Sequence, residues 1–123
     1  MKFALFNGMG GTTWSEVLDL WRHVDATGWD AACVTDHFMP NTKDRAGDTM
    51  ECWTTLAALA AETRRIRVGT IVSGNTYRHP ALLAKMAAGV DIISNGRLIC
   101  GIGAGWQENE DEAYGIPLYT VGV

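Results

Sequence analysis

Four short apolar segments recur along the chain at regular intervals, and this spacing constrains the fold more than any other feature. The segments start near Lys2, Ala31, Ile66 and Arg97, so successive starts are 29, 35 and 31 residues apart. Each segment is followed by a stretch with helical periodicity. A buried strand followed by a helix at this period is typical of right-handed βα units in a parallel sheet. We therefore predict an α/β fold built from four βα units.

Capping signals locate the helices between these segments. Thr13 and Glu16 form a capping box, Glu51 lies in the first turn of an alanine-rich stretch, and His79 precedes a proline that is tolerated at a first helical position. The expected strands cover residues 2–6, 31–35, 66–72 and 97–102. The expected helices follow Thr13, cover residues 51–63 and 80–93, and begin a short fourth helix at 109–114.

Composition and charge indicate which class of protein this is and which kinds of partner it can bind. The 123 residues are 47% hydrophobic and 20% charged, as in a soluble globular domain, and we expect one domain over residues 1–123. A net charge of −4 without a basic cluster argues against nucleic acid or an anionic membrane as partner. The chain has no apolar run of membrane-spanning length and no secretory pattern at its start. We expect a cytoplasmic protein with a small-molecule substrate.

Polar residues that could carry chemistry stand where strands end. Asp36 and His37 follow the second strand, and the polar stretch 73–78 follows the third. In parallel α/β folds, ligands bind at the carboxyl ends of strands. Histidine can transfer a proton near neutral pH, and Asp36 would set its charge. The alternative is that Asp36 only caps the loop and that His37 is merely exposed.

Two further patterns point away from common cofactor and metal motifs. The run Gly101-x-Gly103-x-Gly105 is no dinucleotide fingerprint, because Trp106 occupies the place of the last glycine. These glycines either let a flat ligand approach the strand end or let the backbone turn sharply. Asp36, His37 and Glu51 could in principle bind a metal, but no HxH or HExxH spacing accompanies them. We predict no metal site.

Several longer stretches resemble one protein family. They are VTDHF (34–38), MECWTTLAALAAET (50–63), RIRVGTIVSGNTYRHPALLAKMAAGVDIISNGRL (65–98) and GIGAGWQENEDEAYGIP (101–117). Together they are similar to the luciferase-like monooxygenases, and most of all to the branch that uses coenzyme F420. The resemblance implies a (β/α)8 TIM barrel and an F420- or flavin-dependent oxidoreductase, with FMN as the alternative cofactor.

The resemblance also implies a location for the cofactor. In the family the flat ring lies across the carboxyl face of the barrel, against a bulge after the third strand that is often held by a non-prolyl cis peptide. Here that bulge would fall within residues 71–74. Proton transfer would belong to His37 with Asp36, and hydride transfer to the cofactor. The residues that match ring-binding positions are Val72, Ser73, Gly74, Asn75, Gly105 and Trp106.

Length separates this chain from a complete member of that family. A full barrel has about 250 residues, whereas this chain has 123. We therefore expect the N-terminal half of a barrel and, with two unpaired sheet edges, a homo-oligomer. Two other hypotheses stay open at this point. One is a non-catalytic half barrel that dimerises through its open edges, and the other is a metal-dependent hydrolase built on Asp36, His37 and Glu51.

Overall fold

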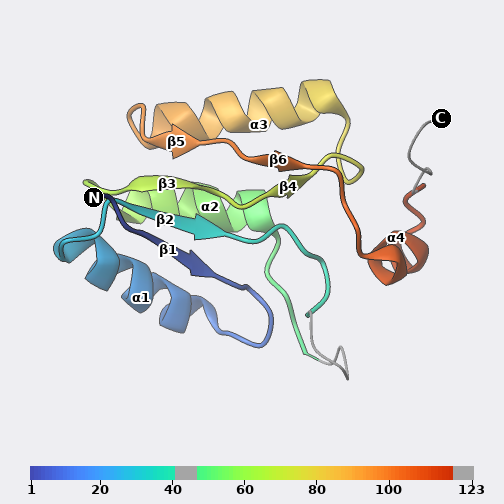
Figure 1. Ribbon diagram of the computed structural model, residues 1–123, viewed down its shortest axis with the longest axis horizontal. Coiled ribbons are helices and arrows are strands. Elements are labelled where there is room, and N and C mark those ends of the chain that lie inside the picture. The colour runs from blue at the N-terminus through green and yellow to red at the C-terminus, as the bar shows by residue number, and fades with distance from the viewer. Residues whose placement is uncertain (41–46, 118–123) are drawn as a thin grey trace.

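The chain alternates strands and helices, as its sequence period predicts. A computed structural model describes residues 1–40 and 47–117 (Figure 1); part of the expected loop 38–50 therefore lies outside the described residues. The strands are β1 (Ala4–Asn7), β2 (Ala31–Val34), β3 (Arg67–Thr70), β4 (Ser73–Gly74), β5 (Leu98–Ile99) and β6 (Ile102–Gly103). The helices are α1 (Trp14–Ala26), α2 (Cys52–Glu62), α3 (Pro80–Ile93) and α4 (Glu108–Tyr114).

A parallel sheet runs through the centre of the molecule. Its strands follow the order β1-β2-β3-β5, and every described pairing is parallel. The register places Ala4 beside Ala31, and Ala31 beside Arg67. Strand order follows chain order, which is the arrangement of consecutive βα units in a barrel wall. The predicted α/β class and its four βα units are confirmed.

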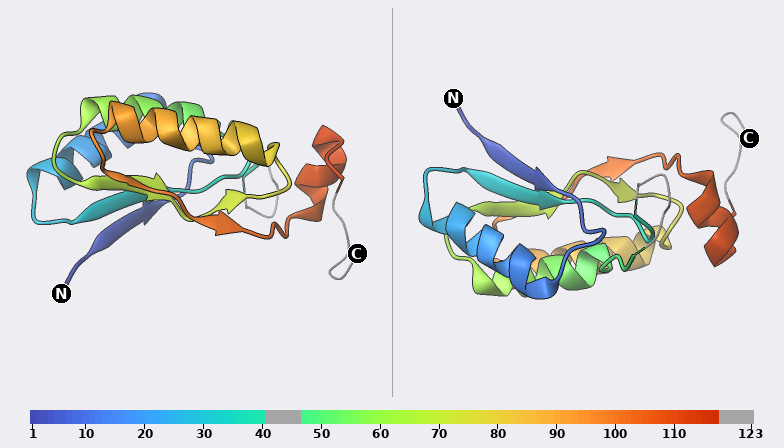
Figure 2. Two further views of the ribbon diagram at one scale, coloured as in Figure 1. Left: turned by 90° about the horizontal axis from the view of Figure 1, so that it is seen from above. Right: turned by 90° about the horizontal axis from the view of Figure 1, so that it is seen from below.

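The three long helices cover one face of this sheet. Figure 2 shows α1, α2 and α3 on the same side, while α4 lies beyond the carboxyl ends of the strands. Among the described residues, no helix covers the opposite face. Several large apolar side chains on or next to the strands are correspondingly exposed: Phe3, Phe6, Ile71, Val72 and Ile102.

The hydrophobic core lies between the sheet and this helical layer. Strand β2 is buried at all four positions, as expected for a central parallel strand. Two tryptophans from α1 and α2 fill the layer, and each indole N–H has a partner: Trp21 donates to Asn7 Oδ1, and Trp53 donates to Ser73 Oγ, both at 2.9 Å. Because these indoles are buried and paired, they are core residues and do not face a ligand.

The helices begin at the capping residues that the sequence indicates. Thr13 and Glu16 form the reciprocal capping box of α1, and the His79 ring accepts the Ala81 N–H at the start of α3. Glu51 lies one position earlier than expected. It is the N-cap of α2, where its carboxylate accepts the backbone N–H groups of Trp53 and Thr54. These caps satisfy N–H groups that a helix leaves free at its first turn.

The sheet divides near its carboxyl edge, and here the sequence-based prediction was incomplete. Ser73 and Gly74, expected in a loop, form β4, which pairs with β6 in a separate two-stranded sheet. The strand expected over 97–102 is accordingly split into β5 and β6. β4 and β6 therefore form a separate pair beyond β3 and β5, on the side of the carboxyl ends of the strands (Figure 1).

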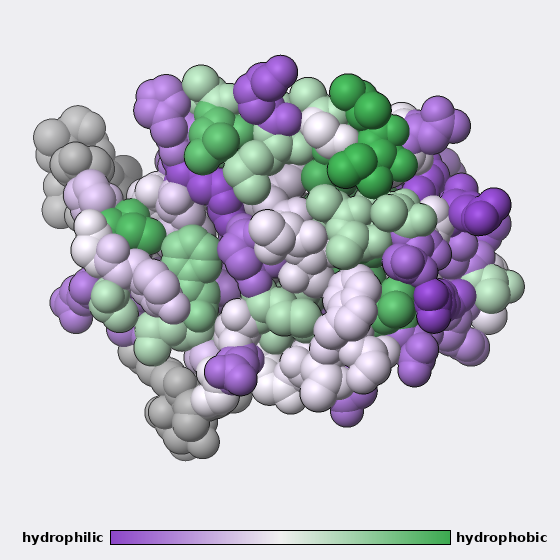
Figure 3. All heavy atoms as spheres, turned by 180° about the vertical axis from the view of Figure 1, so that it is seen from behind, coloured by the Kyte–Doolittle hydropathy of each residue, from purple (hydrophilic) through white to green (hydrophobic). Residues whose placement is uncertain are grey.

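The outer face of the helical layer has an apolar strip of its own. Seen from behind, hydrophobic residues gather along α3 (Figure 3). Within the described ranges, no helix is both long and apolar enough to cross a lipid bilayer. The large exposed apolar residues of α3 are Leu82, Ile92 and Ile93.

Candidate functional site

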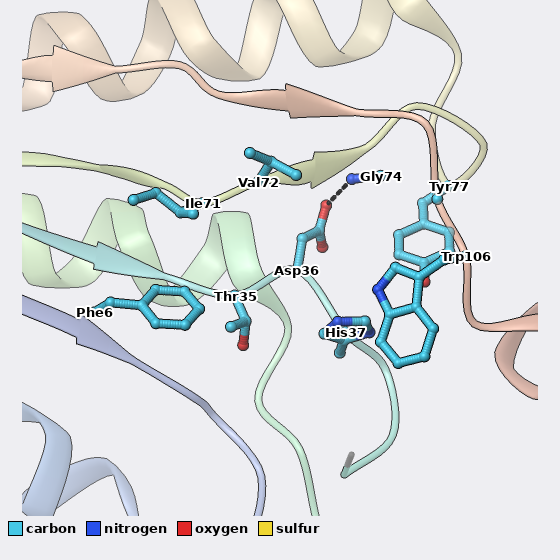
Figure 4. A pocket seen from close by; sticks show the side chains of 10 residues that line it. Phe6, Thr35, Asp36, His37, Ile71, Val72, Gly74, Tyr77 and Trp106 are labelled. Atoms are coloured by element: carbon cyan, nitrogen blue, oxygen red, sulfur yellow. Dashed lines mark hydrogen bonds between the residues drawn. The ribbon is translucent and has the colours of Figure 1, made fainter.

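A pocket of about 240 Å³ lies at the carboxyl ends of the strands, open to solvent (Figure 4). This is smaller than the roughly 300 to 1,000 Å³ of a complete pocket for a drug-sized ligand, and it suits part of a ligand. Its lining combines aromatic and aliphatic side chains with a few polar groups. The lining residues are Phe6, Thr35, Asp36, His37, Ile71, Val72, Gly74, Tyr77, Gly105 and Trp106.

Most of the residues predicted for the site meet in this pocket, but two do not line it. Ser73 is fully buried, and its hydroxyl accepts the Trp53 indole N–H. Asn75 is exposed, and its backbone N–H donates to the Gly103 carbonyl at 3.0 Å. Both residues shape the backbone around the pocket. The predicted residues that line it are Asp36, His37, Val72, Gly74, Gly105 and Trp106.

Asp36 is anchored by its neighbours. Its buried carboxylate accepts two hydrogen bonds from the Arg78 guanidinium, at 2.5 and 3.0 Å, and one from the Gly74 N–H at 3.2 Å. Arg78 also forms an ion pair with Glu51. Burial raises the pKa of Asp36 above its ordinary value, and the guanidinium opposes that rise. Asp36 therefore ties the end of β2 to β4 and to the loop before α3.

The carboxylate that contacts His37 belongs to Glu110, in α4. Its Oε2 atom lies 3.0 Å from His37 Nδ1 and also accepts the Tyr77 hydroxyl. Its Oε1 atom accepts the backbone N–H groups of Phe38 and Met39 at 2.9 and 2.8 Å. Asp36, which we predict to set the charge of His37, binds Arg78 and Gly74 instead, and the carboxylate in contact with the His37 ring is that of Glu110.

Glu110 was missed because nothing local marks it. It stands in the run Glu108-Asn109-Glu110-Asp111-Glu112, which has the composition of a solvated helix face. Only contacts with residues more than 30 positions away bury it completely. Phe6 and Thr35 were also missed, since each lies at the end of a strand without a distinctive motif, whereas Tyr77 falls in the polar stretch 73–78 but was not singled out within it.

The wall of the pocket is largely apolar. Trp106 is 62% exposed and meets the His37 ring edge-on, with ring centroids 5.6 Å apart and planes at 75°. Ile71 and Val72 form another part of the wall and are linked by a cis peptide bond. The resemblance implied such a bond within residues 71–74, and this expectation is confirmed.

The glycine run packs the strands closely. A Cβ atom on Gly103 would lie 2.4 Å from Val72 Cγ2, and one on Gly101 would lie 2.5 Å from the Thr70 carbonyl oxygen. We expected these glycines to admit a flat ligand or a sharp turn. Gly101 and Gly103 instead allow close approach of the chain before and within β6 to the segment around Val72, whereas Gly105 does turn the backbone, at φ +83°.

The metal hypothesis receives no support from the part of the chain that the structure describes. In residues 1–40 and 47–117, no three His, Cys, Asp or Glu side chains lie close enough together to hold an ion. Asp36 and Glu51, two of the three proposed ligands, bind the same Arg78 guanidinium. A bound guanidinium neutralises the charge that a cation would need.

Comparison with known proteins points to one family. The family model described as luciferase-like monooxygenase matches residues 2–120. An F420-dependent glucose-6-phosphate dehydrogenase from Amycolatopsis mediterranei is 36% identical over 87 residues, which cover 70% of this chain and 26% of that protein. The chain thus spans about a quarter of the length of the curated relatives it matches.

Two solved structures have the same arrangement of elements. The monooxygenase RslO1 from Streptomyces bottropensis superposes with a TM-score of 0.81 at 29% identity, covering 96% of this chain and 37% of that one. An F420-dependent secondary alcohol dehydrogenase in complex with an F420-acetone adduct superposes with a TM-score of 0.85 at 23% identity, covering 98% of this chain and 37% of that one. The second likeness concerns the fold alone.

Proposed function

The chain belongs to the luciferase-like monooxygenase family, and from this premise we propose that it forms the ring-binding side of a coenzyme F420-dependent oxidoreductase. One observation carries the proposal. An exposed apolar wall, with Ile71 and Val72 on one side and Trp106 on another, lines the pocket beside His37 at the carboxyl ends of parallel strands. A planar conjugated ring needs such a wall, and a proton-transfer group must stand beside it.

The residues of this pocket fit a deazaflavin or flavin ring. Val72 and Gly74 lie along one side of the pocket, Gly105 and Trp106 along another, and Phe6 extends the apolar surface at 55% exposure. We assign Val72, Gly74, Gly105 and Trp106 to contact with the ring. We also predict Ser73 and Asn75 at the cofactor. Their hydrogen bonds to Trp53 and Gly103 hold the backbone beside the pocket, so we assign them a supporting role.

We assign proton transfer to His37. When bound, the cofactor ring supplies the hydride chemistry. His37 lines the pocket with a side chain that is 21% exposed, so its ring reaches both solvent and ligand. Its edge contact with Trp106 limits the positions that the ring can take. Asp36 supports this geometry by fixing β4, where Gly74 donates to its carboxylate.

We name coenzyme F420 first and FMN as the alternative. The sequence relative described above is F420-dependent, which favours the deazaflavin. The pocket accepts either ring, because the two ring systems are both flat and similar in size. The substrate is a small organic molecule that gives or takes a hydride. Monooxygenation is the second candidate reaction, favoured by the family description and by the RslO1 likeness.

We also propose that residues 1–123 form the N-terminal half of the barrel found in the relatives. The four βα units in barrel order support this proposal, as does the 37% of each solved chain that the match covers. The rest of such a barrel would cover the open face of the sheet and complete the pocket around the cofactor.

Titration of the chain with F420 and with FMN tests the proposed function. Binding is followed by the fluorescence of each cofactor, which a stacked aromatic ring quenches. Trp106→Ala should weaken binding by up to about tenfold, since an aromatic contact contributes about 0.5 to 1.5 kcal/mol. Trp14→Ala is the matched control, because Trp14 is a partly exposed tryptophan of α1 outside the pocket. The absence of any fluorescence change at high protein concentration would refute cofactor binding by this chain.

A further inference from the structure

Glu110 is the most deeply buried acid of the site, and the proposed function assigns it no role. None of its surface is exposed. Burial of a charged group is costly unless hydrogen bonds compensate it. Four donors surround this carboxylate: two backbone N–H groups, the Tyr77 hydroxyl and the His37 ring. An ionised carboxylate accepts hydrogen bonds and donates none, so four donors match its capacity.

We propose that Glu110 is the positioning residue of His37, and that it holds the neutral imidazole with its proton on Nδ1. The Oε2 atom 3.0 Å away can only accept, so Nδ1 must donate. A neutral imidazole has a proton on only one of its two ring nitrogens. If Nδ1 carries it, Nε2 keeps a free lone pair. The use of that lone pair in proton transfer rests on the proposed function, whereas the position of the proton does not.

Glu110 also fixes the backbone that carries His37. Its Oε1 atom binds the N–H groups of the next two residues, Phe38 and Met39, so one carboxylate orients both the ring and the peptide chain after it. Trp106 supports the ring from another side. Asp36 precedes His37 in sequence but is held by Arg78. Of these two acids, only Glu110 contacts the His37 ring, and it is also the more deeply buried.

Tyr77 completes the arrangement as a second donor to Oε2. Burial, together with the hydrogen bond to Glu110, raises the pKa of Tyr77, so the phenol keeps its proton and remains a donor. Tyr77 and His37 thus share one acceptor atom. Removal of the Tyr77 hydroxyl should leave the His37 contact in place, which makes Tyr77→Phe a matched control.

The position of the proton is measured by nitrogen NMR of the full chain labelled with 15N-histidine. The spectrum is recorded at about pH 9, well above the ordinary histidine pKa of about 6.5, where a free imidazole ring is neutral. Its protonated and unprotonated nitrogens then have well-separated shifts. We expect His37 to show a protonated Nδ1. His79 provides an internal reference of opposite form, because its Nδ1 accepts the Ala81 N–H and its proton must lie on Nε2.

Glu110→Gln should exchange the two His37 shifts. The Gln oxygen takes over the Phe38 and Met39 N–H groups, and the amide NH2 then donates to Nδ1, which moves the proton to Nε2. Tyr77→Phe should leave the wild-type form unchanged. The proposal is overturned if wild-type His37 carries its proton on Nε2 while His79 shows its expected form, or if Glu110→Gln changes nothing. The wild-type spectrum decides even if this variant does not fold. The NMR measurement needs no cofactor. If the chain failed to bind cofactor, the proposed function would be refuted, but the assignment of the His37 proton would not.

Discussion

Arg78 holds the Asp36 carboxylate through two hydrogen bonds, at 2.5 and 3.0 Å, and both side chains are almost completely buried. The same guanidinium pairs with Glu51, the N-cap of α2. This cation therefore joins the end of β2, the start of α2 and the loop before α3. The position of Asp36 in the pocket therefore depends on the cluster of charges formed by Arg78, Asp36 and Glu51.

Arg78→Met should destabilise the chain by about 3 to 5 kcal/mol, because it leaves the buried Asp36 carboxylate without its counter-charge. Urea unfolding measures the change in free energy. The control is Arg22→Met, which breaks an exposed pair with Glu62 and should cost less than about 1 kcal/mol. Adding Asp36→Asn to Arg78→Met should recover part of the loss. Equal costs for the two arginine variants would contradict the importance of the cluster.

Asp25 should make stability depend on acid pH. Its carboxylate accepts the backbone N–H groups of Arg64, Arg65 and Ile66 at 2.8 to 2.9 Å. Partial burial raises the pKa of Asp25, but these bonds outweigh it, and the pKa falls below its ordinary 3.8. A lowered pKa in the folded state gives stability that is present above the ordinary value and lost as pH falls through the folded one.

Asp25→Ala should therefore cost about 1 to 2 kcal/mol at pH 7, a value reduced by the partial exposure of the group. The difference from wild type should shrink as the pH falls below about 4. Thermal unfolding across pH 2 to 8 follows both effects. Asp19→Ala, at an exposed position of the same helix, should shift stability by less than about 0.5 kcal/mol. A loss that stays constant across this range would argue against the carboxylate hydrogen bonds.

Gly103→Ala should displace Val72, since the new Cβ atom would lie 2.4 Å from Val72 Cγ2. Overpacking of this kind costs about 1 to 3 kcal/mol, and it moves a residue of the pocket wall. The matched variant is Gly89→Ala, at a helical position with no atom within 4 Å of the new Cβ. It should stabilise the chain by about 0.5 to 1 kcal/mol. Unfolding midpoints of the two variants should move in opposite directions.

Ser73→Ala should destabilise the chain by about 1 to 3 kcal/mol, because it leaves the buried Trp53 indole N–H without an acceptor. Tryptophan fluorescence during urea denaturation measures the change in the free energy of unfolding. Ser15→Ala, at an exposed position in the first turn of α1, should change stability by less than about 0.5 kcal/mol. If the two serine variants were equally stable, the Trp53 hydrogen bond would contribute nothing.

Local sequence predicted the regular elements well and the connections across the sheet poorly. The helix α3 was predicted with its bounds, because His79, Pro80 and an apolar periodicity all act within one segment. Strands β4 and β6 each have two residues, too few for any periodicity, and exist because Ser73 pairs with Ile102. A pairing between distant segments leaves no local signal, so these strands were not predictable from the sequence.

The site divides in the same way. His37, Trp106 and the segment around Val72 could be predicted, because strand ends and family motifs mark them. The partner of His37 could not, since adjacency in sequence favoured Asp36, and only the tertiary fold decides which acid lies within 3.0 Å of the ring. Two acids of the same chemical type differ here only in the contacts that surround them.

The contact between His37 and Glu110 joins residues 73 positions apart. Closing a chain segment of this length costs entropy that only contacts formed elsewhere can offset. On the folding pathway, the pair should therefore form after the helices and after the local strand pairings. The arrangement of the histidine is a late product of folding, and it should be among the first features lost when α4 detaches from the strand ends. Hydrogen exchange at the Phe38 and Met39 amides, which donate to Glu110, would measure how often α4 detaches.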